Sequence, residues 1–91
     1  ATAIAATTAR ARNAIANVQA AQRRVDALES TAVPEATEAL RLTERSYAEG
    51  RATLLELLDA QNAYTATRTA LTDARLALAL ATAELGRIAA R

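Results

Sequence analysis

The chain has 91 residues and a net charge of +1, with 11 basic and 10 acidic side chains and no cysteine, histidine or methionine. This charge gives no reason to expect nucleic acid or an anionic membrane as a partner, and thiolate, imidazole and thioether metal ligands are excluded. Apolar residues make up 52%, but most are alanine and the only aromatics are Tyr47 and Tyr64. Because each buried alanine contributes little, we expect the isolated chain to self-associate or to need missing parts of a longer protein.

The first predicted element is a helix over about residues 2–49, because this stretch contains no glycine and one proline. Pro34 lacks a backbone donor and clashes with the carbonyl four residues before it, so a kink is expected there. The alternative is a helix that ends near Ala32, followed by a second one with Thr31 as its cap. We favour one kinked helix.

The apolar pattern of this first helix is irregular. A seven-residue step runs through Ala11, Val18, Val25, Ala32 and Ala39, with Ile4, Ile15, Leu28 and Leu40 beside it. Gln22 and Glu29 interrupt the second position of the repeat. The pattern still indicates a coiled-coil-like seam along one face.

The sequence predicts a tight turn at Gly50. A glycine just beyond a helix end is typical of a left-handed residue that terminates the helix. Thr53 is a plausible N-cap of the next helix, and Glu56 three residues later completes a capping box. Such a short connection makes neighbouring helices antiparallel. The sequence therefore predicts an all-α fold, a long antiparallel helical hairpin with its tip at Gly50.

The second predicted helix, over about residues 53–89, has a regular heptad repeat. One seam position holds Leu57, Tyr64, Leu71, Leu78 and Leu85, and the other holds Ala60, Thr67, Ala74, Ala81 and Ile88. Glu56 and Asp59 lie beside the first turn of this repeat and share a helical face. They are interpreted either as solvated charges that favour the helix N-terminus or as acids that form a ring when several hairpins assemble.

The residues around the tip resemble a signature of the TolC-type outer-membrane efflux protein family, YxxG followed by LLxLLDAQ. The residues that carry it are Tyr47, Gly50, Leu54, Leu57, Leu58, Asp59, Ala60 and Gln61. The run VPEATEALRLTERSY, with Pro34, is also similar to the family. In detail the chain resembles the second hairpin of the family's internal repeat and its heavy-metal efflux branch. It departs from the pattern at Asn62, where Arg is common, and at Tyr64, where Leu is common.

The resemblance implies that residues 1–91 are a fragment of the periplasmic tunnel of a larger homotrimeric outer-membrane channel. Such channels export small molecules or metal ions with a periplasmic adaptor protein and an inner-membrane pump. Gly50, Arg51 and Ala52 would form the tip that docks the adaptor. Glu56 and Asp59 would narrow the entrance, with Arg45 or Arg51 pairing with them in the closed state. The remaining motif residues would pack near the tip: Tyr47, Leu54, Leu57, Leu58, Ala60 and Gln61.

Two other interpretations remain open, the hairpin of the adaptor protein itself and a plain structural coiled coil. An adaptor usually has an Arg-Leu-Ser type motif at its tip, which is absent at Gly50. Catalysis is not expected, because Ser30 and Ser46 have no histidine to act as a base. We expect no cofactor, metal site or nucleic-acid partner.

Overall fold

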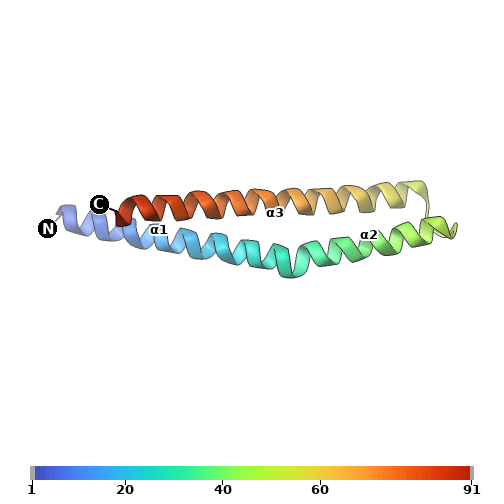
Figure 1. Ribbon diagram of the computed structural model, residues 1–91, viewed down its shortest axis with the longest axis horizontal. Helices are drawn as coiled ribbons and strands as arrows, with labels where there is room; N and C mark the ends of the chain where they lie inside the picture. The colour runs from blue at the N-terminus through green and yellow to red at the C-terminus, as the bar shows by residue number, and fades with distance from the viewer. Residues whose placement is uncertain (1, 91) are drawn as a thin grey trace. The chain divides into compact units, whose positions relative to one another are not determined.

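The computed structural model describes residues 2–90, and all its regular elements are helices. Helix α1 is Thr2–Ala27, a π-helical segment follows at Leu28–Ala32, α2 is Val33–Ala48 and α3 is Leu54–Ala89 (Figure 1). The predicted all-α fold is confirmed, and the connection between α2 and α3 lies at Gly50, as expected. We refer to Leu28–Ala32 as the π turn.

The chain divides into two compact units, which are described separately. The first combines Ala1–Val25 with Asp73–Arg91, so that parts of α1 and α3 lie side by side and antiparallel (Figure 1). The second is Asp26–Thr72, which contains the π turn, α2, the tip and the first half of α3. The second unit is therefore a helical hairpin that includes the candidate site.

The heptad predicted for α3 is confirmed by the burial of its side chains. All ten seam positions, from Leu57 to Ile88, are buried or half-buried. Leu71 and Ala74 are the most buried, at 3% and 2% exposure. Outside the repeat, only Ala70 and Glu84 of α3 are other than exposed. The apolar stripe of α3 therefore follows one period of seven throughout the helix.

The seam predicted for the first arm is right in part. Its buried or half-buried positions are Ala11, Ala14, Val18, Ala21, Val25, Leu28, Ala32, Val33, Ala36, Leu40, Thr43 and Ser46. Gln22 and Glu29 are exposed, so they do not interrupt the seam, because its second position falls one residue earlier at Ala21 and Leu28. Ala39 was expected in the seam but is exposed, and Leu40 takes its place.

The backbone stays helical through Pro34, and the distortion that accommodates the proline lies before it. The Val33 N–H donates to the carbonyl of Leu28, five residues earlier, and Ala32 and Val33 both keep right-handed helical angles. The alternative of a helix break with a Thr31 cap is wrong, since no side-chain cap hydrogen bond precedes α2. A π turn widens the helix locally, which is a recognised cause of helix distortion.

Candidate functional site

The tip begins where α2 ends in a Schellman motif. The Arg51 N–H donates to the Ser46 carbonyl at 2.8 Å, and the Gly50 N–H donates to the Tyr47 carbonyl at 3.0 Å. Gly50 has φ +76, the left-handed conformation that this motif requires. The carbonyls of Ser46 and Tyr47 are thereby satisfied, and the expected role of Gly50 as a left-handed helix terminator is confirmed.

The next helix, α3, begins at Leu54 and is capped by the side chain of Thr53. Thr53 Oγ1 accepts a hydrogen bond from the Glu56 N–H at 3.1 Å, which satisfies one of the free donors in the first turn of α3. The predicted N-cap is therefore confirmed. The Ala52 N–H also donates to the Ser46 carbonyl at 3.2 Å, so hydrogen bonds stabilise both ends of the turn between α2 and α3.

Glu49 pairs with two arginines of the tip. Its carboxylate accepts from Arg45 Nε at 3.1 Å and forms a second ion pair with Arg51. Arg45 or Arg51 was expected to pair with Glu56 and Asp59 in the closed channel, and in this structure both arginines pair with Glu49. The spacing of four residues between Arg45 and Glu49 was the signal that could have identified the first pair.

A small pocket lies at the tip between the end of α2 and the start of α3. Its volume is about 190 Å³, and it is lined by Leu42, Thr43, Ser46, Arg51, Ala52 and Glu56. We call these six residues the tip pocket. Glu56 thus shares a concave surface with two of the expected tip residues, Arg51 and Ala52. Asp59 is exposed one turn further along α3.

The other residues of the tip signature divide into two groups. Leu57 and Ala60 are half-buried in the α3 seam, whereas Gln61 is exposed. Large apolar side chains around the turn are also exposed: Leu42, Tyr47, Leu54, Leu55 and Leu58. Leu55 is 68% exposed and is not one of the signature residues. The tip is therefore surrounded by apolar surface that this chain alone does not cover.

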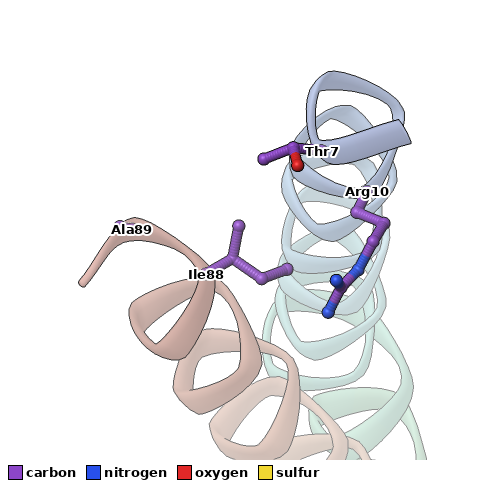
Figure 2. Close-up of a pocket in the computed structure, with 4 residues that line it drawn as sticks. All are labelled: Thr7, Arg10, Ile88 and Ala89. Carbon is purple, nitrogen blue, oxygen red and sulfur yellow. The ribbon is translucent and has the colours of Figure 1, made fainter. Parts of the chain in front are cut away.

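A second concave region lies within the first unit, near the ends of α1 and α3. Figure 2 shows Ile88 projecting from α3 toward Thr7 and Arg10 of α1, with Ala89 beside it. These four residues line a cavity of about 490 Å³. Arg10 is the one charged group among them, and no described residue near it suggests a reaction or a ligand.

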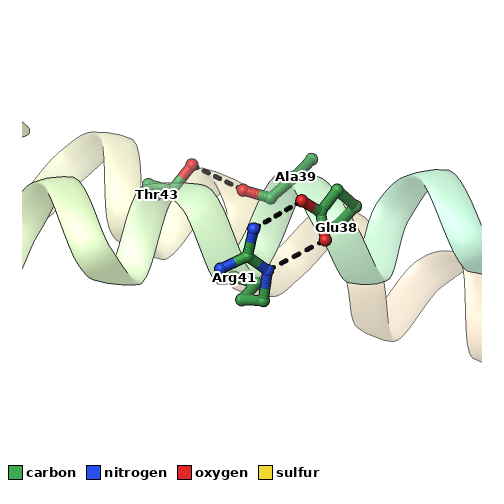
Figure 3. A network of polar contacts seen from close by, with 4 residues as sticks. All are labelled: Glu38, Ala39, Arg41 and Thr43. Atoms are coloured by element: carbon green, nitrogen blue, oxygen red, sulfur yellow. Dashed lines mark hydrogen bonds and ion pairs between the residues drawn. The ribbon is translucent and has the colours of Figure 1, made fainter.

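Glu38 and Arg41 form a two-pronged ion pair on the surface of α2 (Figure 3). Arg41 Nε donates to Glu38 Oε2 at 2.9 Å and Nη2 donates to Oε1 at 2.6 Å. These bonds lower the pKa of Glu38 from its ordinary value. In the same view Thr43 Oγ1 donates to the Ala39 carbonyl at 2.8 Å, so this half-buried hydroxyl is satisfied within its own helix.

The described residues include no group of three or more His, Cys, Asp or Glu side chains placed to hold a metal ion. Over the same range, no helix combines the length and the apolar character needed to cross a membrane. The features of the site are thus a rigid turn, a small charged pocket and a surrounding apolar surface, which suit binding to another protein better than chemistry on a small molecule.

No curated protein and no solved structure is significantly similar to the chain. The family model described as outer membrane efflux protein matches residues 1–91. This is a family of transport components and not of enzymes, and the match agrees with the resemblance of the tip signature. The chain therefore belongs to the outer membrane efflux protein family.

Proposed function

We propose that this chain is a periplasmic hairpin of a trimeric outer-membrane efflux channel, and that Gly50, Arg51 and Ala52 are the surface on which an adaptor protein docks. The observation that carries the proposal is the tip itself. A helix end fixed by a Schellman motif and a helix start fixed by Thr53 leave a turn that loses little conformational freedom on binding. Membership of the efflux family favours a channel over the adaptor hairpin.

The apolar surface around the turn supports docking to a protein. Leu54, Leu55 and Leu58 are each between 45% and 68% exposed at the start of α3. Exposed leucines grouped in this way mark surfaces that bind other proteins. The ion pairs of Glu49 with Arg45 and Arg51 add a polar rim, which is the usual arrangement around an apolar contact.

Glu56 and Asp59 are proposed to form a negative ring where three copies of the tip meet. Both are exposed, and the arginines of the tip pair with Glu49, so these two carboxylates face solvent outside those ion pairs. Rings of carboxylates favour cations and disfavour anions in a pore. The ring would therefore act on cations that enter from the periplasm.

The docking proposal is tested by charge reversal in the full-length channel. Arg51→Glu is compared with Arg41→Glu, since both arginines are exposed and both pair with a glutamate. We expect Arg51→Glu to reduce copurification of the adaptor and export, while Arg41→Glu leaves both near wild type at equal channel abundance. Equal adaptor recovery in the two variants would contradict docking at the tip.

The acidic ring is tested by conductance of the purified channel in planar bilayers. The test variant carries both Glu56→Ala and Asp59→Ala. The control variant carries both Glu35→Ala and Glu44→Ala, and so lacks two exposed acids of α2. Block by added divalent cations should weaken in the first pair of substitutions and persist in the second. Unchanged block and conductance in the first variant would rule out the ring.

A further inference from the structure

The buried pattern of the first arm shifts by one residue at the π turn. Up to this point the half-buried and buried positions alternate in steps of three and four, ending at Leu28 and Ala32. Uninterrupted continuation of these steps would place the next seam residues at Glu35, Ala39 and Leu42, all of which are exposed. The observed seam instead continues at Ala36, Leu40 and Thr43.

The size of this shift matches the geometry of the π turn. A hydrogen bond from Val33 N–H to the Leu28 carbonyl spans five residues, whereas an α-helical bond spans four. The π turn thus takes up one extra residue and leaves the helix regular on both sides. Ser30 Oγ donates to the carbonyl of Asp26, two residues before the turn, at 2.6 Å.

The residues that follow give a reason for the shift. Without the shift, the step pattern would bring the Glu35 carboxylate into the seam, and burying an unpaired charge is costly. The observed phase places Ala36 and Leu40 there and leaves Glu35 in solvent. The apolar pattern therefore requires one extra residue between Leu28 and Ala36, the stretch that contains the π turn, whether or not a proline is present.

We propose that the π turn is a positioning element: it takes up one extra residue, so that α2 keeps the rotational phase that its apolar seam requires, and this phase determines which α2 side chains wall the tip pocket. Leu42, Thr43 and Ser46 form that wall, and a rotation of α2 by one residue, about 100°, would turn Thr43 away from it. The functional consequence rests on the proposed docking role of the tip, but the phase itself is a property of this chain.

The phase can be measured because the chain has no cysteine. Single reporters Ala39→Cys and Leu40→Cys are placed in the wild-type background, and their rates of reaction with a maleimide are compared. We expect the exposed position 39 to react several-fold faster than the half-buried position 40. With Pro34→Ala added, the order of the two rates should stay the same, because the seam and not the proline holds the phase.

Deletion of one residue provides the second test. Removal of Ser30 together with Pro34→Ala should abolish the π turn, preserve the order of the two rates and leave the urea midpoint close to that of Pro34→Ala. The matched control is removal of Asn62, an exposed residue of α3, in the same Pro34→Ala background. This deletion puts the α3 heptad out of phase and should lower the midpoint strongly.

Two outcomes would overturn the proposal. One is a reversed order of the rates in Pro34→Ala, which would make the proline the cause of the π turn. The other is a loss of stability on removing Ser30 as large as that on removing Asn62. Both measurements are made without adaptor, so a tip that fails to dock a partner would refute the proposed function while leaving these results unaffected.

Discussion

Substitution of the two glycines by alanine should have opposite effects on stability. Gly50 adopts φ +76 in the tip, while Gly86 lies within α3. A Cβ added at either position would meet nothing within 4 Å. Neither substitution therefore causes a steric clash with neighbouring residues, and the difference between them comes from the backbone alone.

The expected magnitudes follow from this geometry. Alanine in the left-handed conformation costs roughly 1–2 kcal/mol, partly offset by the smaller conformational entropy of the unfolded chain, which is worth about 0.4–1 kcal/mol. Gly50→Ala should thus lower the free energy of unfolding by about 1 kcal/mol. Gly86→Ala should raise it by about 0.5–1 kcal/mol, because glycine is unfavourable within a helix.

The assay is urea denaturation followed by far-UV circular dichroism, with both variants at the wild-type protein concentration because self-association would shift the midpoint. An unchanged slope of the transition shows that a shifted midpoint reports stability. If Gly50→Ala is neutral or stabilising while Gly86→Ala behaves as expected, the left-handed terminus is not required and the account of the tip is wrong. Equal shifts of one sign in both variants would refute the backbone argument altogether.

Three other perturbations test separate parts of the fold. Thr53→Ala removes the cap of α3 and should cost about 1 kcal/mol in urea denaturation; no loss would mean that the cap is redundant. Leu71→Ala removes a side chain that is 3% exposed and should cost about 2–5 kcal/mol, whereas Leu76→Ala, at 60% exposure, should stay within about 0.5 kcal/mol of wild type. Arg41 lowers the pKa of Glu38 in the folded chain, so the contribution of Glu38 to stability is present above its unfolded pKa of about 4.3 and is lost as the pH falls through the lowered folded value. Arg41→Gln should return the pKa of Glu38 to its ordinary range, which is measured by following the carboxyl NMR shifts with pH. A titration curve that does not change would contradict the pairing.

The sequence was sufficient to predict the parts of the fold that depend on local chemistry. The left-handed glycine, the Thr53 cap and the α3 heptad each follow from residues within one or two turns of each other. Arg51, Ala52 and Glu56, which the family resemblance assigns to the docking tip and the entrance, line one pocket, but their roles there stay predictions.

The phase of the first arm could not be predicted in the same way. The sequence allows a seam that runs through Ala32 and Ala39, seven residues apart. It equally allows a seam that shifts by one residue after Ala32 and continues through Leu40. Alanine contributes so little burial that the pattern does not distinguish the two phases. The position of the extra residue depends on how α2 packs against α3, and the sequence of one helix alone does not determine that packing. The pairing of Glu49 with Arg51 was missed for a related reason, since Arg51 reaches Glu49 only because the turn folds back.

The four most buried side chains are Ala14, Val25, Leu71 and Ala74, and among the described residues no polar or charged side chain is buried with them. A buried polar group is the usual feature that fixes the alignment of paired helices. Here apolar residues repeat every seven positions along α3 and, on each side of the π turn, along the first arm, so a slide of one heptad, about 10 Å, would still match apolar with apolar. The covalent turn at Gly50 prevents that slide. A protease that cuts after Arg51 would leave both helical faces intact and yet free them to pair out of alignment.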